Sequence, residues 1–365
     1  IASRLTSSLR SNDTVARLGG DEFVVLLDIG VDEKSASCIA DKIIKEIQKP
    51  VNLNDTIVSV GASIGISLYP NNGDSSDKLL KSADLAMYSA KNEGRDNYKF
   101  YTPQMNIEAT ARLEKESNIK IAHNNNEFIN HYQPIVDGRH KCAVGVELLM
   151  RWDSPHGLIS PFQFIPIAEE IGLIIQMTEA ALVRGLTDLK QWQKTHPDFY
   201  LSINISPKHF MQDNLVEFIQ SQLSLFDISS DTLRVEVTES MLISDPKKAI
   251  NIMCELSKTG VKIALDDFGT GFSSLSYLKQ LPLDIIKIDR SFVMGINESK
   301  ADEAIIDATL VLAQSLNMAC IAEGIETKEQ HDYLIDRGCH LIQGYYYSKP
   351  VSAQFILNNE PANVA

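Results

Sequence analysis

Acidic, amide and lysine side chains close a series of short apolar segments in the later part of the sequence. Each segment has the length and composition of a buried strand. If these strands run parallel in one barrel, the residues that close them meet at a single mouth. The residues in these positions are Glu147, Asn204, Glu236, Asp266, Asp267, Lys287, Glu323 and Gln343.

Five carboxylates gathered at one mouth need positive charge, because close like charges disfavour joint ionisation. Oxygen ligands favour Mg²⁺ or Mn²⁺ over Zn²⁺, and the adjacent Asp266 and Asp267 can serve two ions at once. Two such ions clamp a phosphodiester and activate water. A single acid such as Glu147 is more often an ion-pair partner than a catalytic group, so the prediction of a two-metal hydrolytic site depends on the whole set.

Lys287 stands between Ile286 and Ile288 in one of these apolar segments. Burial would lower the pKa of its amine, whereas nearby carboxylates would raise it. The sequence leaves the balance open. We expect Lys287 to deprotonate or to orient the attacking water.

The elements that would position these residues alternate between short apolar runs and longer helical patterns from Phe128 onward. Eight such runs predict a β/α barrel. They cover residues 131–136, 143–150, 200–205, 233–237, 261–265, 285–288, 319–322 and 340–347.

The first hundred residues predict a separate α+β unit. Residues 17–27 suggest a hairpin, since Gly19 and Gly20 supply the backbone freedom of a tight turn before an apolar run. We expect a helix at 36–48, a strand at 56–67 and a helix at 77–91. Thr102 and Pro103 begin a predicted connecting helix. The expected divisions are therefore 1–101, 102–126 and 127–365.

The composition bounds the class of protein. The chain has 365 residues, 44% hydrophobic and 22% charged, and its formal net charge of -14 argues against binding to duplex nucleic acid. Five scattered cysteines without a CxxC pair are typical of a reducing cytoplasm. Since the chain begins at Ile1 without a signal-like segment, we expect a piece of a longer protein whose upstream part could include a membrane anchor.

Seven motifs in the later part resemble the EAL-domain cyclic diguanylate phosphodiesterases over about residues 115–355. The tripeptide at Glu147 has Leu148 where that family usually has Ala, and we expect only altered packing from this. The motifs are ELL at 147–149 with RW at 151–152, NISP at 204–207, EVTES at 236–240, DDFGTG at 266–271, KID at 287–289, AEGIET at 322–327 and QGY at 343–345.

The resemblance implies roles for these residues. Metal ions would be held by Glu147, Asn204, Glu236, Asp266, Asp267 and Glu323, while Lys287 would position or deprotonate water. Arg151 would bind a substrate phosphate and Gln343 would line the site. Glu239 and Glu326 would fix the loop at 268–275, which in the family couples metal binding to a dimer interface, so a homodimer is expected.

The earlier part resembles the second half of a GGDEF diguanylate cyclase domain. In that family Asp21 corresponds to a metal ligand, Lys91 and Arg95 to phosphate contacts, and Arg10 with Asp13 to a site that grips cyclic diguanylate. The upstream aspartate motif and guanine-reading residues would lie before Ile1. The motifs are Gly19, Gly20, Asp21, Glu22 and Phe23, then residues 83–88 and 90–95.

Together these observations predict metal-dependent hydrolysis of cyclic diguanylate to linear pGpG. The first unit is expected to regulate this activity and not to make cyclic diguanylate as the chain stands. Two alternatives stay open: a sensor that binds cyclic diguanylate without turnover, and a longer bifunctional protein whose intact cyclase domain binds GTP. An unrelated metal-dependent barrel lyase would not require this order of motifs.

Overall fold

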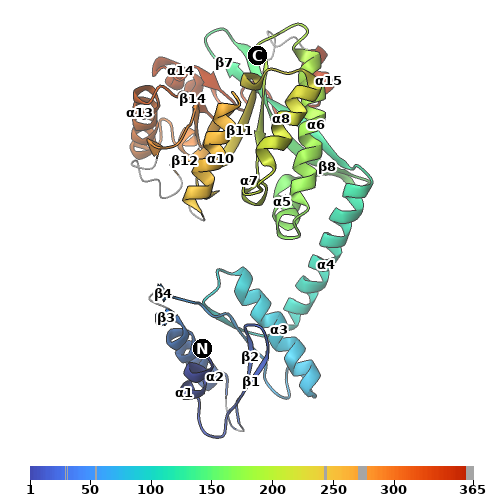
Figure 1. Cartoon of the computed structure of the whole chain (residues 1–365), viewed down its shortest axis with the longest axis vertical. Coiled ribbons are helices and arrows are strands. Elements are labelled where there is room, and N and C mark those ends of the chain that lie inside the picture. The colour runs from blue at the N-terminus through green and yellow to red at the C-terminus, as the bar shows by residue number, and fades with distance from the viewer. Residues whose placement is uncertain (29, 31, 54–55, 242–244, 270–277, 359–365) are drawn as a thin grey trace. The chain divides into compact units, whose positions relative to one another are not determined.

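A computed structural model describes residues 1–28, 30, 32–53, 56–241, 245–269 and 278–358. The chain divides into two compact units, Ile1–Lys115 and Glu116–Ala365 (Figure 1). None of the helices in the described ranges has the length and apolar composition that crossing a bilayer requires.

Up to residue 102, the first unit is built in its described residues from short strands and three helices. The helices α2 and α3 cover the predicted helical ranges. The predicted hairpin is confirmed as β1 paired antiparallel with β2. The elements are α1 (Ala2–Ser8), β1 (Thr14–Gly19), β2 (Glu22–Leu26), α2 (Glu33–Gln48), β3 (Val51–Leu53), β4 (Thr56–Val58), β5 (Ile64–Ile66), α3 (Ser76–Asn92) and β6 (Tyr98–Phe100).

The single strand predicted at 56–67 is wrong, because the chain changes partner within it. β4 pairs antiparallel with β3, whereas β5 pairs parallel with β6. Between them, Gly61 lies so close to Asp96 that a Cβ would come within 1.8 Å of its Oδ1. A uniform apolar pattern does not reveal such a change of partner. Helix α4 (Pro103–Asn124) then leads toward the second unit, as expected from Pro103.

The second unit is a closed barrel with helices outside it. Strand β10 pairs with both β11 and β8, and this closes a ring of eight described strands. Each predicted apolar run contributes one strand, although β15 is shorter than its run. The strands are β7 (Phe128–Asp137), β8 (Cys142–Ser154), β10 (Tyr200–Asn204), β11 (Leu233–Thr238), β12 (Lys262–Phe268), β13 (Ile285–Ile288), β14 (Ala319–Ala322) and β15 (Leu341–Ile342).

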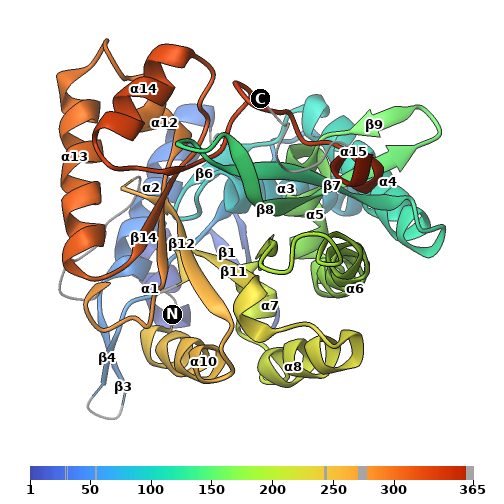
Figure 2. The ribbon, with the colours of Figure 1, turned by 90° about the horizontal axis from the view of Figure 1, so that it is seen from above.

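Helices surround this ring, as the view from above shows (Figure 2). A short strand, β9 (Gly157–Ile159), extends β8 as a hairpin. A 3₁₀ turn, η1 (Ser230–Thr232), precedes β11. The helices are α5 (Pro161–Glu170), α6 (Ile174–Trp192), α7 (Pro207–Phe210), α8 (Leu215–Phe226), α10 (Pro246–Lys258), α12 (Arg290–Met294), α13 (Lys300–Ser315), α14 (Lys328–Asp336) and α15 (Ala353–Asn358).

The first strand of the barrel runs opposite to its neighbours, which the sequence did not indicate. β7 pairs antiparallel with β8 and with β15, while the other ring pairs are parallel. Alternating polarity and apolar runs report burial and not strand direction. The parallel strands still bring their C-terminal ends to one mouth, and this mouth is where the predicted residues lie.

Candidate active site

Glu147 is held at the barrel mouth by two amides. It lies on β8 with only 6% of its surface exposed. Asn204 at the end of β10 donates from Nδ2 to Glu147 Oε1 at 2.6 Å. Gln343, which follows β15, donates from Nε2 to Glu147 Oε2 at 2.6 Å. Three residues far apart in sequence therefore meet at one carboxylate.

Lys287 is the cation at the centre of the site. It lies on β13, with 1% of its side chain exposed, and it faces acids from four other strands or strand ends. Its Nζ lies 2.5 Å from Glu236 Oε2, 2.5 Å from Glu323 Oε1, 3.4 Å from Asp266 Oδ1 and 3.6 Å from Glu147 Oε2. One ammonium thus faces four carboxylates.

Burial and neighbouring charges together shift the pKa values of these groups. Burial alone would lower the pKa of Lys287, but the carboxylates outweigh burial and raise that pKa well above its ordinary value. Burial and then the charge of Glu147 raise the pKa of Glu236 to about 8, against the opposing effect of Lys287. Burial also raises the pKa of Glu323 well above its usual range. The sequence left open whether burial or the carboxylates decide the pKa of Lys287. In the structure the carboxylates decide it, and Lys287 is protonated.

Asp267 adopts a backbone conformation that is uncommon for residues other than glycine. Its φ is 55°, in the left-handed region, and its N–H donates to Asp266 Oδ1 at 3.1 Å. The pairing of β12 with β13 shifts register at this place, between Leu265 and Phe268. Burial and the neighbouring charge of Asp266 raise the pKa of Asp267. Such local strain is found at sites where side chains must be aimed.

The donor set matches hard divalent cations in its chemistry. The acids and amides provide oxygen ligands. Burial, together with the charges of neighbouring carboxylates, raises the pKa of Glu236 and of Glu323. Gln343 Oε1 is buried without a hydrogen-bond partner among the described residues. As the side chains stand, no three acidic, histidine or cysteine groups in the described ranges converge on a common ion position. The four carboxylates of the cluster are instead directed at Lys287 Nζ.

The other predicted residues of the barrel lie nearby with different environments. Arg151 is half-buried on β8 and donates from Nη1 to Met150 O at 2.8 Å. Burial lowers its pKa, opposed by the charges of Tyr345 and Glu147. Glu239 is buried, whereas Glu326 is exposed and accepts from Arg290 Nη2 at 2.7 Å. The loop that they are expected to fix includes residues 270–277, which lie outside the described residues.

Two polar residues at the mouth were missed from the sequence. Gln133 on β7 accepts from Gln343 Nε2 at 3.2 Å and donates to Ser348 O at 3.2 Å. Ser202 on β10 donates to Glu236 Oε1. Ser202 stands two residues before Asn204, and this period of two places both on the inner face. That spacing was the signal that could have found it.

The motif residues of the first unit lie at an exposed hairpin turn, unlike the buried carboxylates around Lys287. Gly20 has a φ of 51°, and Arg17 Nε donates to its carbonyl at 3.0 Å. The predicted Asp21 and Glu22 follow at the turn, where both are exposed. Phe23 is half-buried against the small core around Leu5, Ile43 and Ile47.

The residues of the predicted inhibitory site lie in a turn before this hairpin. Asp13 accepts from the Arg10 N–H at 2.8 Å and from the Asp28 N–H at 3.3 Å. The Arg10 side chain is exposed. Asp13 therefore stabilises the local backbone, and its role toward a nucleotide stays a prediction.

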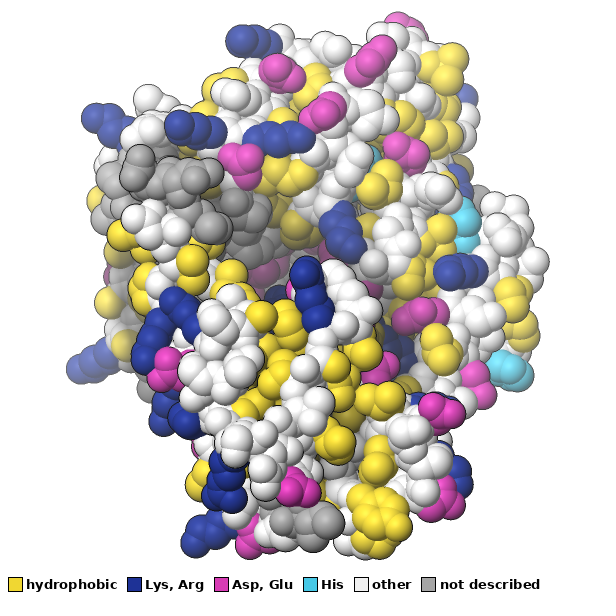
Figure 3. Space-filling view, turned by 60° about the horizontal axis from the view of Figure 1, so that its bottom comes forward, with side chains coloured by type: hydrophobic (Ala, Val, Ile, Leu, Met, Phe, Trp, Pro, Cys, Tyr) yellow, Lys and Arg dark blue, Asp and Glu magenta, His cyan; other side chains and the backbone are white. Residues whose placement is uncertain are grey.

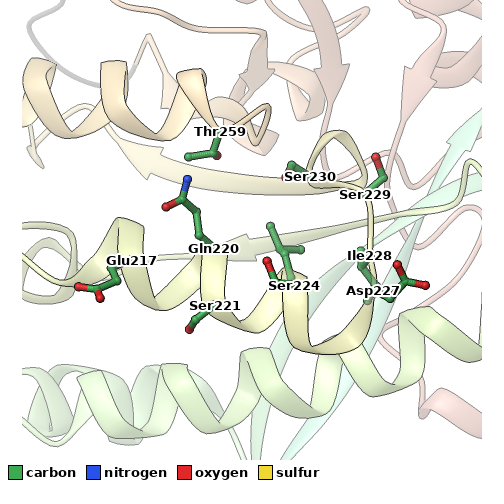
Figure 4. A pocket seen from close by; sticks show the side chains of 10 residues that line it. Glu217, Gln220, Ser221, Ser224, Asp227, Ile228, Ser229, Ser230 and Thr259 are labelled. Carbon is green, nitrogen blue, oxygen red and sulfur yellow. The ribbon is translucent and has the colours of Figure 1, made fainter.

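The molecular surface shows two further features. A polar hollow of about 770 Å³ lies where the end of α8 meets η1, lined by Glu217, Gln220, Ser224, Ser229 and Thr259 (Figure 4). It borders the start of β11, at the barrel end opposite the mouth, so it is not part of the cluster around Lys287. On the face shown in Figure 3, basic side chains are spread with acidic ones between them.

Comparison with known proteins agrees with this geometry. A family described as EAL domain matches residues 116–350, and one described as diguanylate cyclase, GGDEF domain matches residues 1–97. The bifunctional diguanylate cyclase/cyclic di-GMP phosphodiesterase MucR of Pseudomonas aeruginosa is 38% identical over 98% of this chain and 52% of its own length. The cyclic di-GMP phosphodiesterase PdeR of Escherichia coli is 33% identical over 96% of this chain and 53% of its own length. The chain spans about half the length of these curated relatives.

Solved structures show the same barrel. A structure described as PaMucR phosphodiesterase in complex with c-di-GMP has 37% identity and a TM-score of 0.65, covering 67% of this chain and 99% of that one. The EAL domain of Mycobacterium smegmatis DcpA has 29% identity and a TM-score of 0.55, covering 63% of this chain and 96% of that one.

The barrel, with one antiparallel strand and an acidic mouth around a lysine, is an EAL domain, and the chain belongs to that family. The family's activity is generally dependent on divalent metal ions. With the GGDEF match in its first unit, the chain combines a GGDEF region with an EAL domain.

Proposed function

We propose that the chain hydrolyses one phosphodiester bond of cyclic diguanylate to give linear pGpG, with two Mg²⁺ or Mn²⁺ ions. The observation that carries this proposal is the convergence of Glu147, Glu236, Asp266 and Glu323 on Lys287 at the barrel mouth. The 37% identity to a phosphodiesterase described in complex with c-di-GMP, over 99% of that chain, supports the choice of substrate.

The acids and the amide at the mouth are the ligands that we assign to the ions. Bound there, two divalent ions supply Lewis acidity, lowering the pKa of water and neutralising charge on the phosphoryl group. The raised pKa values of Glu236, Glu323 and Asp267 support this assignment, because burial and neighbouring carboxylates both disfavour the charged acids and a cation offsets both effects. The proposed ligands are Glu147, Asn204, Glu236, Asp266, Asp267 and Glu323.

The reaction adds water across one P–O3′ bond. The water oxygen bonds to phosphorus and the P–O3′ bond breaks; the water loses one proton and the released 3′ oxygen takes up one, so that no net proton is gained or lost in this step. A protonated Lys287, which its raised pKa favours, holds and orients the water and does not abstract its proton. Arg151 pairs with a substrate phosphate, and Gln343 lines the site while it holds Glu147.

Two acids outside the central cluster are assigned to the loop after Asp267. Glu239 is buried just after β11, and Glu326 is anchored by Arg290 in the segment after Glu323. Both positions follow a proposed metal ligand by three residues. We assign them the role of holding that loop against the cluster, so that metal binding and loop position are linked.

The GGDEF unit is assigned a regulatory role within this chain. Its glycine turn and exposed Asp21 are intact, which supports nucleotide binding in a longer protein where GTP could be a ligand. In this chain we expect no synthesis of cyclic diguanylate. Incubation with GTP and Mg²⁺ followed by nucleotide chromatography tests this, and a cyclic diguanylate peak would refute it.

The proposal also includes an oligomeric state, a homodimer, and a cellular compartment, the cytoplasm. We assign a homodimer through the barrel, which light scattering tests, and a monomer with full activity would contradict it. The five cysteines are all free, which agrees with a reducing cytoplasm.

The test of the activity uses this chain with cyclic diguanylate and Mg²⁺ or Mn²⁺. Chromatography should show pGpG only when a metal ion is present and only with Glu147 intact, Glu147→Ala being the control. Tight binding of cyclic diguanylate without product would refute hydrolysis and favour the sensor alternative.

A further inference from the structure

A buried serine hydroxyl lies directly beneath the carboxylates of the mouth. Ser202 has 1% of its surface exposed, and its Oγ donates to Glu236 Oε1. Its strand, β10, lies between β8 and β11. Ser202 is paired in register with Glu147 on one side and with Arg234 on the other. It is therefore flanked by the strands that carry two of the proposed metal ligands.

With this hydroxyl, each carboxylate oxygen of Glu236 has a hydrogen-bond donor. Oε1 of that carboxylate accepts from Ser202, and Oε2 contacts Lys287 Nζ at 2.5 Å. Glu236 itself is only 1% exposed. A buried carboxylate oxygen without a donor is strongly disfavoured, so the rotation of this carboxylate is set by one donor on each oxygen. When Oε2 turns to a metal ion, Ser202 is the donor that stays.

The layer below keeps Ser202 in place. The Tyr200 ring lies so close to Gly145 on β8 that a Cβ there would come within 2.4 Å of it. On the other side the Arg234 guanidinium carbon lies 3.1 Å from the centre of the same ring. Tyr200 thus connects the three strands just before Ser202 in the chain, and their register cannot slip without breaking this packing.

We propose that Ser202 is a positioning residue that orients Glu236 for binding a divalent cation. The inference rests on the proposed metal-dependent function. Ser202 touches neither substrate nor ion. It acts by holding Oε1, so that the carboxylate keeps one rotation and Oε2 stays turned toward Lys287 at the centre of the mouth. Outer partners of this kind typically change metal affinity by about 10- to 100-fold when they are removed.

The experiment measures Mn²⁺ uptake by the unmutated chain, Ser202→Ala, Ser202→Cys and Thr178→Val. Electron paramagnetic resonance of free Mn²⁺ gives the affinity without any turnover. Thr178→Val is the matched control, because Thr178 is also a buried hydroxyl, with 2% exposed, but donates to Ile174 O within α6. Ser202→Ala should weaken Mn²⁺ binding by about 10-fold or more. Ser202→Cys, a weaker donor of similar size, should lie between serine and alanine.

Each outcome decides one of the two proposals. If the unmutated chain takes up no Mn²⁺, the metal-dependent function itself fails. If the unmutated chain binds Mn²⁺ and Ser202→Ala matches Thr178→Val, only the positioning role fails, whatever the activities are. Circular dichroism shows whether Ser202→Ala folds. If it does not fold, the test uses Ser202→Cys alone. Mn²⁺ affinity of Ser202→Cys equal to that of the unmutated chain then overturns the positioning role of Ser202.

Discussion

The barrel mouth and the GGDEF hairpin both contain acidic motifs, but the two places are built differently. At the mouth, acids from separate strands surround the buried Lys287, and the pKa of Glu236 rises to about 8 because of burial and charge. In the hairpin, Asp21 and Glu22 are neighbours along the chain and are exposed to solvent. Acids that come together from distant segments and are buried have strongly shifted pKa values, as catalytic sites require. Acids that are merely adjacent in an exposed motif lack that burial.

The largest expected effect follows from removing a carboxylate at the mouth. Glu147→Ala should lower hydrolysis of cyclic diguanylate by about 10²–10³-fold or more, the size typical for loss of one stabilising group at the reacting centre. Steady-state chromatographic rates measure it. Glu217→Ala, in the hollow beside α8, is the matched control and should stay near the unmutated rate. Equal losses in both variants would contradict the contrast between the mouth and the rest of the surface.

Removing the central cation should destabilise the barrel. Lys287→Met leaves buried carboxylates without their positive partner, so the free energy of unfolding of the metal-free chain should fall by about 3–5 kcal/mol. Denaturant unfolding measures this. Lys262→Met is the control, because Lys262 pairs with Asp284 near the surface at 2.9 Å and should cost about 0–1 kcal/mol. A similar small loss for Lys287→Met would show that the cluster is not held by its cation.

A pH-dependent loss of stability is expected in the barrel. His209 on α7 is buried, and burial lowers its pKa to about 4. The folded chain favours neutral His209, whereas in the unfolded chain the imidazole binds a proton below about pH 6.5. The free energy of unfolding is therefore highest above about pH 6.5 and falls as the pH is lowered toward 4. The total is about 3 kcal/mol. His209→Gln should remove that part of the pH dependence. Parallel pH profiles for the two chains would contradict it.

The smallest effect is expected in the hairpin. Asp21→Asn changes an exposed side chain at the β1–β2 turn, so the unfolding free energy should shift by no more than about 0.5 kcal/mol. Hydrolysis should change less than about 2-fold, since Asp21 is not part of the mouth cluster. A large loss of hydrolysis in Asp21→Asn would reveal energetic coupling between the two motifs.

Much of the barrel was predictable, because its strands are short apolar runs that end in polar residues. Glu147, Asn204, Glu236 and Lys287 were identified in this way and do lie together. The direction of β7 was not predictable, since a buried strand has the same pattern in either direction. The pKa of Lys287 depends on distances to acids on other strands, which no local pattern contains.

Other features were missed for different reasons. Ser202 is a small polar residue within an apolar run, and its importance comes only from Glu236 on the neighbouring strand. The strand predicted at 56–67 divides because β4 pairs with β3 and β5 with β6, and Asp96, far along the chain, approaches Gly61 between them. In both cases a contact that is distant in sequence decides what the local residues do.

Because β7 is antiparallel to β8, the first residues of β7 lie at the barrel end that contains the mouth. Because β7 runs against β8, Phe128 pairs with Trp152 and Ile129 pairs with Arg151. Glu127 accepts from the Trp152 indole at 2.9 Å and from the Asp153 N–H. The residues that follow α4 therefore lie about one interstrand spacing, roughly 5 Å, from Arg151. The arginine that we assign to a substrate phosphate is thus joined to the segment after α4 by strand pairing and by hydrogen bonds to its neighbours Trp152 and Asp153.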